Sequence, residues 1–192
     1  MIKLNLSKFR KEYDQYDIKR EKIIKQSRVV LKLSKQLIYS IHRNNKSESL
    51  KLKEQLNKEY FKLLNIKDLS KKLEFEGSLN EASEEYVEAM LYFSYVYENN
   101  LVEFDELKVS IDNYLGGLSD LTGELGRRAV QMTIKKKYSE VYDIQEFVSS
   151  IFKEILKFNF RNGSLRKKSD AIKWNLTKIE NIVYDIEIKE KN

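Results

Sequence analysis

The chain has 192 residues, of which 41% are hydrophobic, and this is enough for one domain with a core of its own. It has no cysteine, which excludes disulfides, thiolate zinc sites and cysteine nucleophiles. With 36 Lys and Arg against 30 Asp and Glu, the net charge is +6, and the pI of about 9.2 favours nucleic acid or an anionic membrane surface as a partner. We expect a single domain over residues 1–192 and a cytoplasmic location. No export signal or membrane span is expected, since no stretch approaches the roughly 18 to 20 apolar residues of a span.

Residues that break helices are nearly missing, since the chain has no proline and only six glycines. We therefore predict an all-α fold, a helical bundle of about six to seven helices. The first expected helix runs from Leu6 to about Arg43, where apolar residues recur every three or four positions. At about 1.5 Å per residue it would be roughly 55 Å long, which exceeds what a compact domain of this size needs. Contact between subunits of an oligomer is one use for the excess length.

The rest of the chain also reads as helices separated by short breaks. A polar turn at 44–49 is followed by an expected helix from Glu48 to about Leu64, a short helix after Asp68 and a break at 76–80. The next helix, 80–99, is different, because every residue from Tyr86 to Tyr97 except Glu88 is apolar, aromatic, Ala or Ser. A helix that is apolar on all sides is typically buried. Further helices are expected at 103–114, 114–137, 139–159 and 164–187, with Asn162-Gly163 as the stop before the last.

Charge is distributed unevenly along the chain. Residues 1–72 hold 20 Lys and Arg against 8 acids, residues 73–124 hold 13 acids against one Lys, and residues 125–192 hold 15 Lys and Arg against 9 acids. The three segments therefore carry +12, −12 and +6. Carboxylates gathered within an otherwise cationic chain form the layout needed to hold a divalent metal and attract a polyanion.

Two carboxylate pairs in the acidic segment are candidate metal ligands. Glu85 and Glu88 are three residues apart and Asp120 and Glu124 are four apart, so each pair shares one face of its helix. Two such helices facing each other would offer four oxygen ligands to a hard cation such as Mg²⁺ or Mn²⁺. Zinc fits poorly, because His42 is the only histidine and there is no cysteine.

Simpler explanations exist for some of these acids. A carboxylate on a helix most often lies on a solvated face. Glu85 is equally well explained by favourable interaction with the N-terminus of its helix. Glu81 and Glu84 fit that explanation better still and are not candidate ligands. Glu88 is the exception, because it lies within the apolar run. A buried carboxylate costs several kcal/mol unless it is paired or binds a metal, so we expect Glu88 to have a partner.

The segment around Asp120 contains four of the six glycines, at 116, 117, 123 and 126. Each costs about 1 kcal/mol relative to Ala inside a helix, so either another helix or a ligand approaches closely, or residues 115–119 form a loop. Arg127 and Arg128 follow Glu124 by three and four residues, which suits an intrahelical salt bridge or a phosphate contact. A second basic cluster, Arg166, Lys167 and Lys168, is a candidate nucleic-acid contact, although such clusters are usually only solvated surface.

At these residues the chain resembles the translin family, and more specifically its catalytic branch, translin-associated factor X. The resemblance rests on four stretches: the spacing of Tyr13, Asp14, Ser27-Arg28, Ser34-Lys35 and His42-Arg43; the sequence EYVEA at 85–89; DLTGEL at 120–125, preceded by YLGG at 114–117; and SLRKK at 164–168 with Glu180 and Val183-Tyr184-Asp185. It covers nearly the whole chain. Translin's basic nucleic-acid segment corresponds here to about 71–80, which contains Glu74 and Glu76, so its contacts do not carry over.

The resemblance implies an all-helical fold, a hollow oligomer of about eight subunits and metal-dependent endonuclease activity on single-stranded RNA. It assigns Glu85, Glu88, Asp120 and Glu124 as ligands of Mg²⁺ or Mn²⁺ and as catalytic residues. Plain translin lacks this acid set and binds without cutting by itself, so the acids favour an enzyme. The combination of a translin-like C-terminus with the acids of the catalytic branch suggests a chain that assembles with itself, which we expect to be a homo-octamer. The alternatives are a non-catalytic oligomer that binds single-stranded RNA or DNA, like translin, and a helical nucleotide pyrophosphohydrolase.

Overall fold

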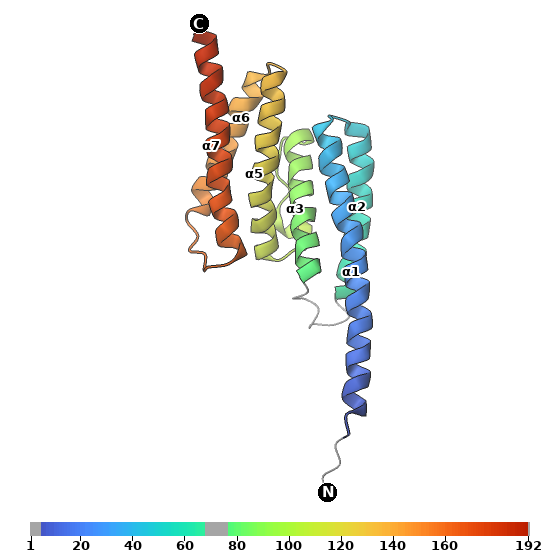
Figure 1. Cartoon of the computed structure of the whole chain (residues 1–192). Coiled ribbons are helices and arrows are strands. Elements are labelled where there is room, and N and C mark those ends of the chain that lie inside the picture. The colour runs from blue at the N-terminus through green and yellow to red at the C-terminus, as the bar shows by residue number, and fades with distance from the viewer. Residues whose placement is uncertain (1–4, 68–76, 192) are drawn as a thin grey trace. The chain divides into compact units, whose positions relative to one another are not determined.

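The computed structural model describes residues 5–67 and 77–191, and within them the chain forms seven helices and no strand. The all-α prediction is therefore confirmed, as is the long first helix, which has 36 residues (Figure 1). The chain divides into two compact units, an N-terminal unit up to Tyr86 and a C-terminal unit from Val87 onward. A single domain over the whole chain stays a prediction.

In the N-terminal unit, helix α1 (Ser7–His42) packs against helix α2 (Lys46–Lys67). The apolar residues that gave the three-and-four spacing form the contact, and they are fully or almost fully buried: Ile23, Val30, Leu37 and Ile41 from α1, with Leu56, Tyr60 and Leu63 from α2. Burying side chains of this size contributes about 1.5–3 kcal/mol each, which is what orders two helices so rich in lysine.

The first turns of α1 are not covered by this contact. Phe9, Tyr13 and Ile18 are 65%, 67% and 58% exposed, although they are large apolar or aromatic side chains. Figure 1 shows these turns extending beyond the end of α2. The excess length expected from the sequence is therefore real and carries exposed apolar groups.

The turn between α1 and α2 is tighter than the sequence suggested. Asn44 adopts a left-handed conformation (φ 54°), and the N–H groups of Asn44 and Asn45 donate to the carbonyls of Ile41 and Ser40 at 2.8 and 3.1 Å. This is the usual hydrogen-bond pattern at a helix C-terminus. The side-chain oxygen of Asn45 then accepts from the Glu48 N–H at 3.2 Å and caps α2, so α2 begins at Lys46.

In the C-terminal unit, helices α5 (Ile111–Ile134), α6 (Tyr138–Ile155) and α7 (Ser164–Lys191) pack on one another. Their contacts bury an apolar row from each helix: Leu121, Leu125, Ala129 and Met132; Val141, Ile144 and Val148; Ile172, Leu176 and Ile179. Within the described part of the chain, none of the helices is both long enough and apolar enough to cross a membrane.

One expectation for the segment before α5 was wrong. The helix expected at 103–114 is only the four-residue α4 (Phe104–Leu107), because Lys108 turns the chain with a left-handed φ of 55°. Ser110 then caps α5 by accepting from the Asn113 N–H at 3.2 Å. Helix α5 runs without a break through residues 115–119, so the helix expected at 114–137 is confirmed and the loop alternative for its glycine-rich part is excluded.

Two of the four glycines of α5, Gly123 and Gly126, face side chains of another helix. A Cβ on Gly123 would meet the Asn175 side chain of α7 at 3.6 Å, and one on Gly126 would meet Ile179 of α7 at 3.9 Å. Both distances are ordinary van der Waals contacts, so the approach of α7 does not require glycine at either position.

Other boundaries differ by a few residues. Helix α3 begins at Gly77, inside the break expected at 76–80, and α6 ends at Ile155, before the expected 159. Helix α7 begins at Ser164, as expected after Asn162-Gly163. The short helix expected after Asp68 lies outside the described residues.

Candidate functional site

The first carboxylate pair lies on helix α3 (Gly77–Tyr97). Glu88 is only 9% exposed and takes part in a hydrogen-bonding or electrostatic interaction, so the burial and the partner expected from its apolar surroundings are confirmed. Glu85, one turn earlier, is more accessible, and its Oε1 lies 3.7 Å from the Nζ of Lys35 on α1. This ion pair could not be predicted from helical spacing, because its members are 50 positions apart.

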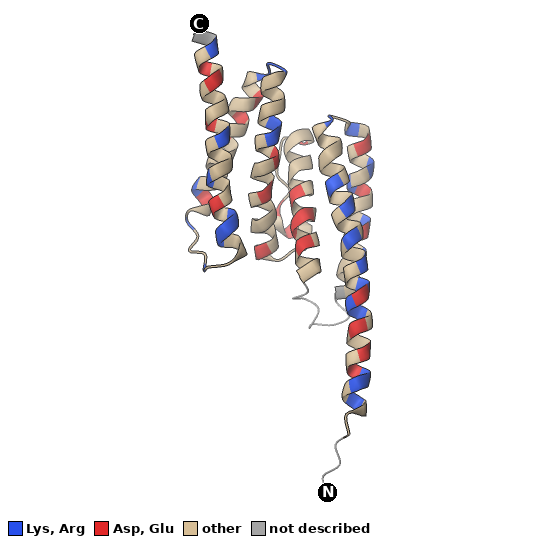
Figure 2. Cartoon of the chain, viewed as in Figure 1, with Lys and Arg blue, Asp and Glu red and all other residues tan. Residues whose placement is uncertain are grey.

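The second pair lies on α5, as Figure 2 shows for the acids of that helix. The Asp120 carboxylate accepts a hydrogen bond from the Lys168 ammonium group of α7, and both side chains are part-buried. Glu124 Oε2 lies 3.9 Å from Arg127 Nη1 on the same helix. Each of these carboxylates therefore has a cationic side chain beside it.

Arg127 and Arg128 play different structural roles. Arg127 is exposed and makes the intrahelical pair with Glu124, which is one of the two roles considered for it. Arg128 is 8% exposed, and its Nη2 donates to Glu140 Oε2 of α6 at 3.0 Å. Lys137 also donates to Glu140 at 3.0 Å. Arg128 thus joins two helices.

The third basic group lies at the start of α7. Arg166 and Lys167 are exposed, and Arg166 pairs with Asp170 one turn later at 3.7 Å. Lys168 differs from both, because it is half-buried against Asp120. The contacts of Arg127, Arg128, Arg166, Lys167 and Lys168 with a nucleic acid stay predictions.

Within the described ranges, no group of three or more His, Cys, Asp or Glu side chains is placed to hold a metal ion. Glu85 and Asp120 belong to different units, so the convergence of all four acids stays a prediction. The donor set itself consists only of carboxylate oxygens, and Glu88 is buried among apolar residues. Such donors fit Mg²⁺ or Mn²⁺ and do not fit zinc.

Tyr92 connects α3 to the acids of α5. Burial raises the pKa of its hydroxyl group, and Glu124 raises it further, while the charges of Arg128 and Arg127 and a hydrogen bond with Arg128 oppose the shift. Tyr92 is fully buried, and it therefore remains a neutral phenol between Glu124 and Arg128.

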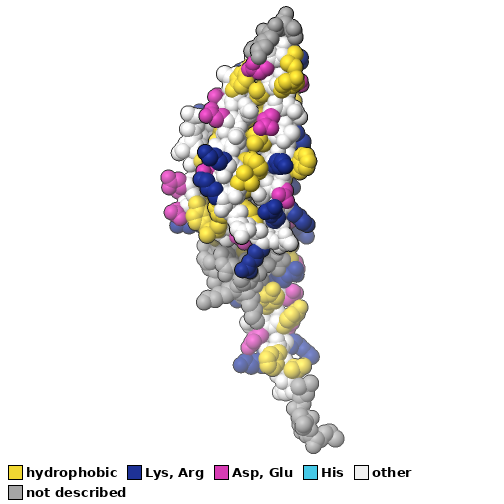
Figure 3. Space-filling view, turned by 90° about the vertical axis from the view of Figure 1, so that its left-hand side faces the viewer, with side chains coloured by type: hydrophobic (Ala, Val, Ile, Leu, Met, Phe, Trp, Pro, Cys, Tyr) yellow, Lys and Arg dark blue, Asp and Glu magenta, His cyan; other side chains and the backbone are white. Residues whose placement is uncertain are grey.

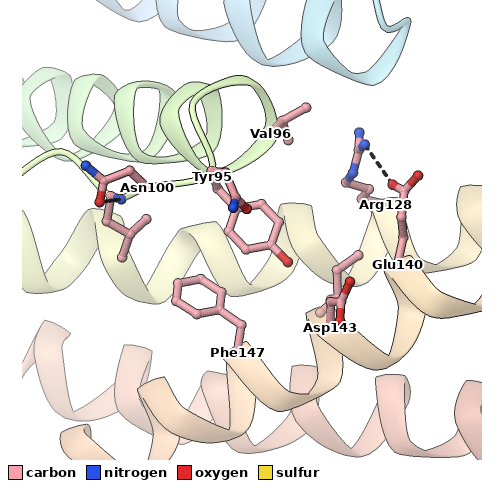
Figure 4. Close-up of a pocket in the computed structure, with 10 residues that line it drawn as sticks. Tyr95, Val96, Asn100, Arg128, Glu140, Asp143 and Phe147 are labelled. Atoms are coloured by element: carbon pink, nitrogen blue, oxygen red, sulfur yellow. Dashed lines mark hydrogen bonds and ion pairs between the residues drawn. The ribbon is translucent and has the colours of Figure 1, made fainter.

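A cavity of about 440 Å³ lies in the C-terminal unit beside Arg128 (Figure 4). Tyr95 of α3 and Phe147 of α6 form one wall, with their rings stacked 4.9 Å apart at 25°. The Arg128–Glu140 pair and Asp143 supply the charged groups of the lining. Burial raises the pKa of Tyr95 to about 12, so its hydroxyl stays protonated near neutral pH.

The sequence did not point to this cavity or to Lys35, Tyr92 and Glu140. The spacing placed Tyr92 on the helix face shared by Glu85 and Glu88 but indicated no partner for it, and Glu140 lies 12 residues from the arginine that it pairs with. Pairings of this kind depend on how helices pack, and helical spacing within one element does not reveal them.

Sequence comparisons find translin and related proteins among the relatives of this chain. The chain is 28% identical to an uncharacterized protein of Methanocaldococcus jannaschii over 84% of this chain and 73% of that protein. It is 36% identical to translin of Gallus gallus over 44% of this chain and 37% of that protein. It is 22% identical to translin-associated protein X of Pongo abelii over 98% of this chain and 79% of that protein.

Solved structures show the same architecture. The crystal structure of apo-NeC3PO has a TM-score of 0.86 at 27% identity, covering 96% of this chain and 98% of that one. The structure of AfC3PO with duplex RNA has a TM-score of 0.83 at 22% identity, covering 98% of this chain and all of that one. Residues 18–190 match the Translin family, to which this chain belongs.

Proposed function

We propose that the protein is a metal-dependent endoribonuclease that acts on single-stranded RNA. The observation that carries the proposal is Glu88, a carboxylate that is 9% exposed in an apolar helix of a translin-family fold. AfC3PO shares this fold and has been solved with duplex RNA, which motivates the choice of RNA as the substrate.

In this proposal Glu85, Glu88, Asp120 and Glu124 hold Mg²⁺ or Mn²⁺. An ion held by these residues would supply Lewis-acid chemistry, namely polarisation of the phosphodiester and a lowered pKa of a bound water molecule. The chain's own cations have two further roles in this proposal. Lys35, Arg127 and Lys168, which lie beside three of the four acids, offset carboxylate repulsion and can donate to phosphate oxygens.

The assembly that we propose is a homo-octamer, as the translin resemblance implies. Exposed apolar side chains support self-association: Phe9, Tyr13 and Ile18 on α1, and Trp174, Tyr184 and Ile188 on α7, which are 66%, 65% and 42% exposed. Figure 3 views the face that carries α7 and shows hydrophobic side chains among Lys and Arg along it. Exposed apolar groups gathered in this way mark protein contacts.

The test is a cleavage assay on end-labelled single-stranded RNA with Mn²⁺, Mg²⁺ or EDTA, using wild type, Glu88→Gln and Asp120→Asn. We expect fragments with either metal and none with EDTA, and loss of cleavage in both variants by roughly a hundredfold or more. Glu81→Gln is the matched control, because Glu81 is an exposed acid on the same helix α3. Light scattering checks that the variants keep the wild-type assembly.

A second function has support from a different observation. Glu85, Asp120 and Glu124 each lie beside a cationic side chain, and no three acids cluster within the described residues, as expected of an oligomer that binds RNA or DNA without cutting it. A shifted RNA band without fragments, in both the Mn²⁺ and the EDTA lanes, would favour this binder and rule out the enzyme.

A further inference from the structure

Helix α1 carries a row of cations that none of the candidate sites above includes. Between Glu21 and Glu48 the sequence has seven Lys and Arg and no acid. Five of them, together with Tyr39, are separated by three or four residues and so lie along one face of α1: Lys25, Arg28, Lys32, Lys35 and Arg43. We call these five residues the α1 basic stripe, and Figure 2 shows Lys and Arg along this part of α1.

The stripe is accessible in the chain. All five cations are exposed, and the opposite face of α1 is the one buried against α2. Among the described residues, Arg28 and Lys32 have no acidic partner, and Lys35 has only Glu85. A surface groove runs along this face, lined by Arg28, Leu31, Lys32, Lys35, Gln36 and Tyr39.

An aromatic side chain lies within the row. Tyr39 is 56% exposed although tyrosine is usually at least half-buried, and the Arg43 guanidinium lies over its ring at 5.7 Å. A cationic groove with an exposed aromatic ring is the arrangement that binds single-stranded nucleic acid, since the cations follow the phosphates and the ring stacks on a base. A membrane surface would instead require several apolar side chains beside the cations.

We infer that the α1 basic stripe is a binding track for the backbone of single-stranded RNA, with Tyr39 as a stacking platform. The Lys35–Glu85 contact of 3.7 Å places the track beside a proposed ligand of the catalytic metal, so a strand bound along α1 passes Glu85. The inference rests on the proposed function for the identity of the polymer. From Lys25 to Arg43 the track extends about 27 Å at 1.5 Å per residue.

The test measures binding without cleavage, by fluorescence anisotropy of labelled oligouridine in EDTA over a range of KCl concentrations. Arg28→Gln with Lys32→Gln removes two cations that have no acidic partner among the described residues. We expect at least a tenfold loss of affinity at low salt, and a decrease in the slope of log K against log salt by about 1.4, since each phosphate contact on a single strand contributes roughly 0.7.

The matched control is Lys51→Gln with Lys58→Gln, which removes two exposed charges from α2 in the same unit. It should retain wild-type affinity within about twofold. If the two double variants bind equally well, net charge alone sets the affinity and the inference is wrong. Thermal unfolding followed by circular dichroism confirms that each variant is folded.

Tyr39→Leu tests the stacking platform separately. We expect a loss of affinity of about fivefold or more with an unchanged salt slope, because base stacking involves no charge. Tyr138→Leu, at a part-exposed tyrosine of α6 to which no binding role is assigned, is its control. An equal effect of the two changes would overturn the assignment of Tyr39.

Two further measurements separate this inference from the proposed function and from a membrane role. If the protein binds RNA through the α1 basic stripe but never cleaves it with Mn²⁺, the proposed nuclease activity is wrong and the proposed binding track is supported. If the wild type cleaves RNA and the Arg28→Gln/Lys32→Gln variant binds RNA as tightly as the wild type does, the nuclease proposal is supported and the binding track is wrong. Vesicles containing phosphatidylserine serve as the competing polyanion, and stripe-dependent binding to them but not to oligouridine would overturn the inference.

Discussion

The ammonium group of Lys168 on α7 donates to the carboxylate of Asp120 on α5, although the two residues are 48 positions apart. One of the proposed metal ligands is therefore held by one of the proposed RNA contacts. The helices themselves pack through apolar side chains such as Leu121 and Ile172, so this ion pair is not needed to hold them together.

Lys168→Gln should separate function from stability. Both members of the pair are part-exposed, and such ion pairs contribute about 0–1 kcal/mol, so we expect the free energy of unfolding to fall by less than about 1 kcal/mol. RNA affinity should fall severalfold, because a phosphate contact is lost. Urea unfolding and anisotropy measure the two effects, and exposed Lys173 of the same helix, changed to Gln, is the control.

The stacked pair Tyr60 and Tyr86 should dominate the stability of the N-terminal unit. Their rings are 3.8 Å apart at 10°, and both side chains are almost completely buried. We expect Tyr60→Ala to lower the free energy of unfolding by about 3–5 kcal/mol. Tyr60→Phe keeps the ring and loses only the 3.2 Å hydrogen bond with Ser83, so it should cost about 1 kcal/mol. Equal losses for the two variants in urea unfolding would refute the role of the stack.

Glu140 should make stability depend on acid pH. Burial raises the pKa of its carboxyl group, but hydrogen bonds and charges from Lys137 and Arg128 outweigh burial and lower the pKa below its usual 4.5. A lowered pKa stabilises the folded state at pH above 4.5, and this contribution is lost as pH falls through the lower, folded-state value. Glu140→Gln should therefore be less stable than wild type near neutral pH, by about 1–3 kcal/mol, because buried Arg128 loses its carboxylate.

The difference between wild type and Glu140→Gln should shrink as the pH falls below about 4.5. Thermal unfolding at a series of pH values measures it. Glu146→Gln, at an exposed position of α6, provides the comparison. A difference that stays constant down to about pH 3 would show that the charge of Glu140 is not responsible.

Gly126→Ala should stabilise the protein. The residue lies inside α5, its φ is not positive, and a Cβ there would meet Ile179 at a comfortable 3.9 Å. Alanine is favoured over glycine inside a helix by about 1 kcal/mol, so the free energy of unfolding should rise by about that amount. A decrease in urea unfolding would mean that α7 packs more tightly on α5 than this distance implies.

The elements were predictable wherever the apolar spacing alone determines a helix. The burial of Glu88 followed from its neighbours in the sequence, and the long α1 followed from the absence of breakers. The stop at Lys108 was missed because a left-handed lysine has no sequence signature, whereas a glycine there would have marked it. The cap at Ser110, by contrast, was a recognisable signal that was overlooked.

The site was predictable only within single helices. Spacing placed Glu85 with Glu88, and Asp120 with Glu124, because residues three or four apart share a face. The partners Lys35, Glu140 and Lys168 come from other helices, and their choice depends on helix packing that no local pattern encodes. The pairing of Arg128 with Glu140 was missed for this reason, since that carboxylate lies on α6.

Because the first turns of α1 are uncovered, we expect their helical structure to depend on protein concentration. Short lengths of isolated helix are marginal in water, and here nothing in the described chain shields Phe9 or Tyr13. Docking against another copy would hold these turns by mass action, so diluting the protein should fray them first. Their amide protons would then exchange fastest in the most dilute sample, while those around Leu37 would keep their protection.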